Sequence, residues 1–367
     1  QPRKSISFLL PSHWLSFSGG AEYQARLLID RLAETATYDL SYLGRRVIED
    51  ADTPYRIVNT GSSRWYSKYS KAFDRPHILR ALEEIKPDLI YQRVAGPYTG
   101  VAADYAEQSG CKFIWHIAHD TDLDREPRGV NAIKRALSRV DVRAIERGIR
   151  RADAIIAQTH YQAKLLEERF ATEATAVIPN FHPEIPEVRR NGIIGRVVWI
   201  ANVRPFKGPE VFLRLAETLG ASTGVEFVMI GRDESGGRFS RKIERQGPTS
   251  NVRYLGELPQ EEVNSFLKES DILVNTSVQE GFPNTFIQAW MRGTVVVSLT
   301  VDPDSVLSKH GLGVCCGTEA ILVETVQRLL VEEEMRNELS RRARQYVIQN
   351  HSLRNADKLI EQMRELL

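Results

Sequence analysis

Residues 269–297 read ESDILVNTSVQEGFPNTFIQAWMRGTVVV. The short apolar runs 272–274 and 295–297 predict two buried strands. Between them, a Gly-Phe-Pro-Asn turn precedes a helix that Thr285 is suited to cap. This strand–turn–helix–strand order places Glu280 on a tight loop at the carboxyl end of a parallel strand. The neighbouring helix N-terminus offers unpaired backbone N–H groups to an anionic ligand, ideally a phosphate.

The same alternation of apolar strands and amphipathic helices runs through both halves of the chain. In the first half it predicts strands at 5–10, 40–43, 88–92, 112–117, 154–157 and 174–178, and helices at 21–34, 98–108, 131–150 and 160–169. In the second half it predicts strands at 197–200, 226–230, 252–255, 272–274 and 295–297, and helices beginning near 209, 260, 285 and 319. A proline-rich stretch, 178–192, separates the halves. We therefore expect two doubly wound α/β domains joined by a linker.

Length and composition agree with that organisation. A chain of 367 residues is more typical of two domains than of one large core. Its 42% hydrophobic and 26% charged residues are ordinary for a globular protein, and the net charge of +1 gives no reason to expect nucleic-acid binding. Three cysteines are too few for a disulfide framework, which favours a reducing compartment. With no apolar run of about 18 residues and no secretion signal at the start, we expect a cytoplasmic protein.

A basic loop follows the first strand of the second half. Residues 197–208 read VVWIANVRPFKG and predict a strand, a loop carrying Arg204 and Lys207, and Gly208 entering a helix. Arginine and lysine at the carboxyl end of a strand suit a diphosphate, because both supply positive charge and arginine adds a two-pronged donor. The alternative is a solvated pair of loop charges.

Two further segments of the first half lie at predicted strand ends. Gly19 and Gly20 open a helix after the first strand, where glycine lets a ligand approach the backbone. They lack the Gly-x-Gly-x-x-Gly spacing of a dinucleotide site. His119 and Asp120 follow a later strand, and His116 on that strand reads as a core histidine or a second contributor. The aspartates at 120, 122 and 124 do not form a calcium loop, because its sixth position is Arg125 instead of glycine.

Several of these segments together resemble the motifs of retaining glycosyltransferases of family 4. The resemblance is carried by the Glu280-Gly-Phe-Pro-Asn segment, the Lys207-Gly208 pair and the His119-Asp120 pair, and it extends over nearly the whole chain. It implies the GT-B fold, two Rossmann-like domains facing each other across the cleft that holds the active site. By position it implies a first domain 1–183, a linker 184–194, a second domain 195–350 and a C-terminal helix 351–367 that crosses back to the first domain.

The resemblance also implies roles for individual residues. Glu280 and His119 would contact the donor sugar, while Lys207 and Arg204 would contact the diphosphate. In the family a second glutamate follows the first after seven intervening residues, and here Gln288 holds that place; its amide can still hydrogen-bond to a ribose diol. The other residues implied by position to bind the nucleotide sugar are Gly19, Gly20, Asn202, Gly231, Phe282, Asn284 and Thr285, with Asn202 standing where the family usually has arginine.

The implied reaction is metal-independent transfer of a hexose, with retention, from a UDP- or GDP-sugar to a hydroxyl acceptor. A glycan or lipid-linked saccharide in surface polysaccharide or glycoconjugate synthesis is the expected acceptor, and no further cofactor is expected. Two alternatives stay open: a catalytically silent sugar-nucleotide-binding subunit of a polysaccharide assembly system, and a GT-B enzyme of another reaction, such as an epimerase or phosphorylase. The basic-aromatic stretch 64–73 and the basic helix 131–151 suggest peripheral contact with the inner face of a membrane.

Overall fold

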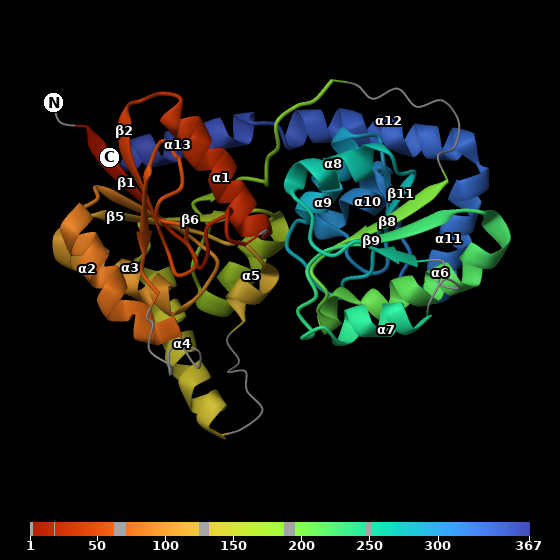
Figure 1. Ribbon diagram of the computed structural model, residues 1–367. Coiled ribbons are helices and arrows are strands. Elements are labelled where there is room, and N and C mark those ends of the chain that lie inside the picture. The colour runs from red at the N-terminus through yellow and green to blue at the C-terminus, as the bar shows by residue number, and fades with distance from the viewer. Residues whose placement is uncertain (1–2, 18, 62–70, 125–131, 187–194, 247–251) are drawn as a thin grey trace. The chain divides into compact units, whose positions relative to one another are not determined.

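The computed structural model describes residues 3–17, 19–61, 71–124, 132–186, 195–246 and 252–367 (Figure 1). The chain divides into two compact units, one of Gln1–Asn180 with Arg354–Leu367 and the other of Phe181–Leu353. Each unit is described by itself. Residues 187–194 of the expected linker lie outside the described ranges.

The first unit is built on a seven-stranded parallel sheet in the order β3-β2-β1-β4-β5-β6-β7. Its strands are β1 (Lys4–Leu9), β2 (Tyr38–Gly44), β3 (Arg56–Asn59), β4 (Leu89–Arg93), β5 (Lys112–His116), β6 (Ala154–Ala157) and β7 (Ala176–Val177). Its helices are α1 (Gly20–Ala33), α2 (Arg75–Ile85), α3 (Pro97–Ser109), α4 (Ala132–Arg151), α5 (His160–Phe170) and α13 (Arg354–Leu366), with short turns η2 (Lys71–Asp74) and η3 (Asp120–Leu123).

Helices cover both faces of this sheet, which explains why its central strands are apolar on both sides. One face packs against α2, α3 and α5 through a core that includes Leu82, Ala102 and Leu166, all fully buried. Neighbouring helices α1 and α13 carry buried leucines at positions 28, 32 and 359. Strand β3 and helix α2 were missed from the sequence. Strand β3 is a four-residue edge strand with alternating exposure, which leaves only a short pattern.

The second unit is built on a six-stranded parallel sheet in the order β10-β9-β8-β11-β12-β13. Its strands are β8 (Arg196–Ile200), β9 (Glu226–Ile230), β10 (Val252–Tyr254), β11 (Ile272–Asn275), β12 (Val295–Ser298) and β13 (Gly313–Cys315). Its helices are α6 (Pro209–Thr223), α7 (Arg238–Gln246), α8 (Gln260–Lys268), α9 (Asn284–Met291), α10 (Val306–His310), α11 (Glu319–Val331) and α12 (Glu333–Asn350), with short turns η4 (Pro205–Lys207) and η6 (Pro303–Ser305).

Alternate residues of these strands enter two separate cores, as the period of two requires. On one face Val197 and Trp199 of β8 pack with α6 and α11. On the other face Val198 packs with α8, α9 and α12, where Trp290 is fully buried. Because both faces are covered, the strands read as continuous apolar runs in the sequence.

Each sheet has one place where the strand order reverses. In the second sheet β8 pairs with β9 on one side and with β11 on the other. Successive strands are therefore added on one side of β8 as far as β10 and on its other side from β11 onward. Ligands of doubly wound folds bind in the crevice outside the carboxyl ends of strands at such a point. The loops that follow β8 and β11 carry Lys207 and Glu280, so tertiary structure places both at the switch point.

The last helix belongs to the first unit, as expected. Helix α13 follows α12 of the second unit, yet its residues group with Gln1–Asn180. Asp357 accepts from Arg31 of α1 at 3.0 Å, and the amide of Asn355 donates to the carbonyl of Pro179 at 3.2 Å. The buried side chains of Leu359, Ile360 and Met363 give the helix its apolar face.

Candidate active site

The centre of the candidate site is an ion pair between the loops after β8 and β11. The Nζ atom of Lys207 donates to Oε1 of Glu280, and the hydroxyl of Ser277 donates to the same oxygen at 2.7 Å. The two charged side chains are only 17% and 12% exposed. A lysine and a carboxylate in this position can together hold a ligand that has an anionic part and a hydroxylated part.

Hydrogen bonds fix the two loops to each other. Trp199 Nε1 donates to Thr276 Oγ1 at 2.9 Å, and that hydroxyl donates to the carbonyl of Lys207 at 2.7 Å. The backbone N–H of Val278 donates to the carbonyl of Phe206 at 2.9 Å. The Lys207 and Glu280 loops are therefore joined to each other, a contact that was not predicted from the sequence. The adjacent polar pair Thr276-Ser277 directly after an apolar strand was the available signal.

Gly208 is required by this loop contact. It has a φ of 62°, in the left-handed region, and a side chain there would overlap the carbonyl oxygen of Thr276. The glycine of the predicted Lys-Gly motif is thus explained by close approach of the two loops.

Arg204 lies on the same loop but points to another carboxylate. Its Nε and Nη2 donate to the two oxygens of Glu234 at 2.6 and 2.8 Å, and its side chain is 38% exposed. The side-chain oxygen of Asn202 accepts from the backbone N–H of Arg232 at 3.2 Å. Both residues therefore link the β8 loop to the β9 loop. Their predicted roles toward a diphosphate stay predictions.

Gly231, at the end of β9, is explained by backbone packing. Its φ is 145°, and a side chain there would overlap the carbonyl oxygen of Ala201. The hydroxyl of Tyr254 donates to the Gly231 carbonyl at 2.7 Å. These contacts account for the glycine without a ligand, and its predicted contact with the nucleotide stays a prediction.

Helix α9 begins two residues earlier than a cap at Thr285 implies. Pro283 is its N-cap and Asn284 its first residue, so the expectation that Thr285 caps the helix is wrong; Thr285 lies inside the first turn. Proline fixes its own φ, here −63°, and its side chain has no hydrogen-bond acceptor, so the N-cap makes no side-chain hydrogen bond to the first turn. Gln288 lies one turn further on and is 3% exposed.

Phe282 packs into the core beside this helix. Its ring centre lies 4.4 Å from that of His351 and 6.1 Å from that of Trp290. The apolar ring anchors the loop two residues after Glu280, a packing role that does not require a ligand.

In the first unit, the loop after β5 carries the predicted His-Asp pair. His119 Nδ1 accepts from the N–H and the hydroxyl of Thr121 at 3.1 and 2.9 Å. The carboxylate of Asp122 accepts from the backbone N–H groups of Ala118 and His119 at 2.8 and 3.1 Å. Burial raises the pKa of Asp122, while these N–H groups and that of Ala95 lower it. Asp122 thus shapes the loop that positions His119, a role missed from the sequence.

The two other aspartates of this loop also have protein partners. Asp120 accepts from Gln162 Nε2 at 3.0 Å, and Asp124 pairs with Arg169 at 2.9 Å. In the described ranges no group of three or more His, Cys, Asp or Glu side chains is arranged to hold a metal ion. Metal independence itself remains a prediction.

His116 is a core histidine. It is fully buried on β5, and its Nδ1 lies 2.8 Å from the hydroxyl of Tyr91. Burial, followed by the positive charge of Arg93, holds the pKa of His116 well below its ordinary value of 6.5. A neutral, buried histidine fits the core reading given above.

The Gly19–Gly20 loop of the first unit contains an unforeseen carboxylate. Gly19 is the N-cap of α1, and a side chain at Gly19 would overlap the carboxylate of Glu22, which is 5% exposed. A carboxylate in the first turn is stabilised by the helix dipole. Glu22 therefore lies beside the glycines at which the sequence suggested a ligand, and the predicted ligand contacts of Gly19 and Gly20 stay predictions.

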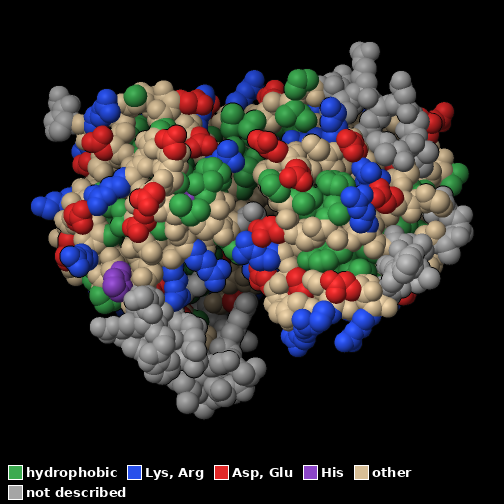
Figure 2. Space-filling model, viewed as in Figure 1, with side chains coloured by type: hydrophobic (Ala, Val, Ile, Leu, Met, Phe, Trp, Pro, Cys, Tyr) green, Lys and Arg blue, Asp and Glu red, His purple; other side chains and the backbone are tan. Residues whose placement is uncertain are grey.

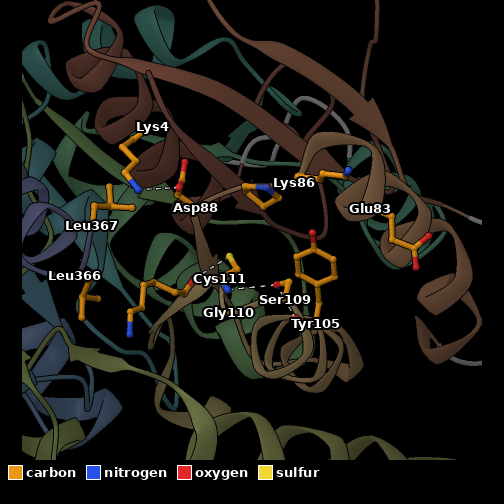
Figure 3. A pocket seen from close by; sticks show the side chains of 12 residues that line it. Lys4, Glu83, Lys86, Asp88, Tyr105, Ser109, Gly110, Cys111, Leu366 and Leu367 are labelled. Atoms are coloured by element: carbon orange, nitrogen blue, oxygen red, sulfur yellow. Dashed lines mark hydrogen bonds and ion pairs between the residues drawn. The ribbon is translucent and has the colours of Figure 1, made fainter. Parts of the chain in front are cut away.

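A cavity of the first unit lies elsewhere. It measures about 660 Å³ and is found at the amino ends of β1, β4 and β5, where Lys4 pairs with Asp88 at 2.9 Å and Leu366 and Leu367 form part of the wall (Figure 3). The carboxyl ends of β1 and β5 lead into the Gly19–Gly20 and His119 loops, at the opposite edge of the sheet. Since ligands of this architecture bind at the carboxyl edge, this cavity is not part of the candidate site.

Charged side chains of both signs occur on the face shown in Figure 2. Lys and Arg side chains are interspersed with Asp and Glu over most of the face shown in Figure 2, in line with a net charge of +1. None of the helices in the described ranges combines the length and the apolarity needed to cross a bilayer. Cys111, Cys315 and Cys316 are free thiols.

Family models match both halves of the chain. The model described as Glycosyltransferase Family 4 matches residues 18–182, and the model described as Glycosyl transferases group 1 matches residues 194–346. A glycosyltransferase 1 domain-containing protein of Xenopus tropicalis is 28% identical over 116 residues, which are 31% of this chain and 34% of that protein. The chain thus spans about a third of that relative's length.

Solved structures share the fold over almost the full chain. Sucrose-phosphate synthase of Thermosynechococcus elongatus superposes with a TM-score of 0.76 and 14% identity, covering 99% of both chains. HepE of Anabaena, in complex with UDP-glucose, gives a TM-score of 0.74 and 16% identity, covering 99% of this chain and 100% of the other. At these identities the likeness shows the fold alone, and it confirms the expected pair of Rossmann-like domains.

Proposed function

The chain belongs to the group 1 and family 4 glycosyltransferases, and we propose that it transfers a sugar, with retention, from a nucleoside diphosphate sugar to a hydroxyl acceptor. The observation that carries this proposal is the Lys207–Glu280 pair at the switch point of the second sheet. A UDP- or GDP-sugar is the proposed donor. HepE, which shares the fold, has been solved with UDP-glucose.

In the proposed reaction the bond between the donor's anomeric carbon and the diphosphate oxygen breaks while the acceptor oxygen attacks from the same face. Lys207 stabilises the charge that grows on the departing diphosphate, and the N-terminus of α9 adds its backbone dipoles. Arg204 contributes only if it exchanges Glu234 for a phosphate oxygen. The departing phosphate oxygen takes the acceptor's proton, so the step needs no separate base.

Glu280 and His119 orient the donor sugar in this proposal. The Glu280 carboxylate can accept hydrogen bonds from two sugar hydroxyls, and Ser277 holds it in place. Gln288, buried in α9, replaces the family's second carboxylate toward the ribose. The proposed reaction uses no metal ion.

The first test is a thermal-shift panel with UDP, GDP, ADP, CMP and dTDP, each with and without magnesium. A nucleotide at 100 times its dissociation constant should stabilise the fold by about 2.7 kcal/mol. Stabilisation by one diphosphate, unaffected by magnesium, selects the donor sugars for a transfer assay, in which NMR of the product reports the anomeric configuration. An inverted product contradicts the proposed stereochemistry.

Lys207→Ala then tests the site. Loss of a cation that stabilises the departing diphosphate should lower the turnover rate about tenfold to a hundredfold. Lys242→Ala is the control, since Lys242 pairs with Glu210 on the surface of the same unit. Near-normal turnover of Lys207→Ala, with an unchanged melting temperature, contradicts the proposed site.

A second candidate function is a silent sugar-nucleotide-binding subunit. The observations that favour it are Gln288 in place of the second glutamate and the engagement of Arg204 by Glu234. Donor hydrolysis measured without acceptor separates the two functions. A chain that binds a nucleotide sugar, yet neither hydrolyses nor transfers it, is a binding subunit.

For the acceptor side we propose a glycan or lipid-linked saccharide and contact with an anionic membrane through α4. The described part of this helix carries exposed Val140 and a series of arginines, of which Arg147 and Arg151 pair with Asp104. Residues 64–70 of the basic-aromatic stretch lie outside the described ranges. Co-sedimentation with vesicles of anionic and of neutral phospholipid tests this contact, and equal sedimentation with both contradicts it.

A further inference from the structure

Lys207 and Glu280 compete with any ligand that needs either of them. The ammonium group of Lys207 donates to Glu280, and both side chains are largely shielded from water. Shielding strengthens their mutual attraction relative to that of an exposed pair. A diphosphate that binds Lys207 comes close to the Glu280 carboxylate, and repulsion between the two anions opposes their sharing one ammonium group.

Glu280 has a second anchor that does not depend on Lys207. Ser277 Oγ donates to Glu280 Oε1 at 2.7 Å, and Ser277 is itself 2% exposed. The backbone N–H of Ser277 donates to Asn275 Oδ1 at 3.1 Å, and its carbonyl accepts from Thr300 Oγ1 at 3.0 Å. When Lys207 moves to another anion, the carboxylate is still held by Ser277, close to its present position.

Lys207 has freedom to move that Glu280 lacks. Lysine carries its charge on a flexible stem with three rotatable donors. Its backbone carbonyl is held by Thr276, while its side chain contacts Glu280 and the face of Phe206, whose ring centre lies 5.3 Å from Nζ. A short swing of the ammonium group is therefore enough to exchange partners.

We propose that the donor diphosphate displaces Glu280 from Lys207, and that this exchange releases the Glu280 carboxylate to bind the sugar hydroxyls. The inference rests on the proposed function and adds to it the order in which the two parts of the donor are recognised. The diphosphate is recognised first, and the sugar contact becomes available as a consequence. Nucleotide and sugar recognition are thereby coupled through one ion pair.

The test is the affinity of UDP, GDP, ADP and dTDP, measured by calorimetry at low ionic strength for the wild type and for Glu280→Gln. Removing the competing carboxylate frees Lys207, so the nucleoside diphosphate that binds the wild type should bind Glu280→Gln about three- to tenfold more tightly. Glu226→Gln is the matched control, because it removes a carboxylate paired with Arg196 at the amino end of β8. The affinity of Glu226→Gln for the nucleoside diphosphate should stay at the wild-type value.

A double-mutant cycle identifies the cause. In Lys207→Met, the further change Glu280→Gln should leave affinity nearly unchanged, because the competed cation is absent. If Glu280→Gln still tightens diphosphate binding in the Lys207→Met background, the cause is the loss of general charge repulsion. The proposed exchange of partners is then wrong. Circular dichroism verifies folding, and Glu280→Ala replaces Glu280→Gln should the latter not fold.

The outcomes separate this inference from the proposed function. If the wild type binds a diphosphate and Glu280→Gln binds it equally or more weakly, the exchange is wrong while the proposed function stands. If neither protein binds any of the four diphosphates, both proposals fail. Tighter binding to Glu280→Gln, lost in the Lys207→Met background, supports the exchange.

Discussion

Arg204 and Glu234 form a two-pronged ion pair across the carboxyl ends of β8 and β9. Nε and Nη2 of Arg204 lie 2.6 and 2.8 Å from the two oxygens of Glu234. Three residues before Lys207, a second cation of the candidate site therefore also has a carboxylate of its own chain as its partner. The positive charge that a diphosphate needs is present but internally balanced.

The first prediction concerns this pair. Glu234→Gln releases Arg204, so nucleoside diphosphate affinity should rise about two- to fivefold, since partly exposed ion pairs contribute about 1 kcal/mol or less. Calorimetry checks this, with Glu257→Gln as control, which breaks the equivalent pair with Arg232. The control should keep the wild-type affinity, and no rise in Glu234→Gln would show that Arg204 does not contact the diphosphate.

The second prediction concerns Gln288. Gln288→Glu restores the family's carboxylate, which can accept hydrogen bonds from both ribose hydroxyls, so UDP or GDP affinity should rise up to about tenfold. Because the side chain is 3% exposed, the charge should also lower the free energy of unfolding by about 1–3 kcal/mol. Gln279→Glu, on the exposed neighbouring loop, is the control. The 2′-deoxy nucleotide should gain less, and an equal gain contradicts a ribose contact.

The third prediction concerns Gly231. Gly231→Ala should lower the free energy of unfolding by about 3 kcal/mol or more, because the new methyl group overlaps the Ala201 carbonyl and the φ of 145° disfavours any side chain. Gly224→Ala is the control; its φ is 65°, but no atom lies near the added methyl group. That variant should cost only about 1 kcal/mol. Chemical denaturation of both variants gives the comparison.

The fourth prediction concerns acid stability. Burial, followed by the charge of Arg292, lowers the pKa of His182 from 6.5 to about 4. The unfolded chain therefore binds a proton that the folded chain excludes, so stability is complete above pH 6.5 and falls as the pH drops toward 4. The slope for this group approaches about 1.4 kcal/mol per pH unit. His182→Gln should show a shallower fall in urea denaturation across this window, and an identical slope contradicts the assignment.

Much of the fold was predictable because central parallel strands are covered on both faces. Their continuous apolar runs identified most strands, including residues 154–157 and 226–230 with their bounds as observed. The four-residue edge strand β3 and the three-residue β13 lacked such a run. Cap geometry was also beyond the sequence at α9, where Pro283 takes the place expected for Thr285.

The site residues were predictable as a set but not in their pairing. Lys207 and Glu280 stood out by their positions after apolar strands. Their contact across 73 positions depends on β8 lying beside β11, which follows from strand order. Ser277, Glu234 and Glu22 were missed, because isolated polar residues near strand ends carry no periodic signal.

The sequence by itself determined the α/β class, the two-domain organisation and the family, because periodicity and short motifs are local properties of the chain. Only the tertiary structure decided which loops meet at each switch point and which carboxylate faces each cation. It also showed that Gly231 and Gly208 serve backbone approach. Those relations join residues far apart in the chain, and they exist only once parallel strands take their places in the sheet.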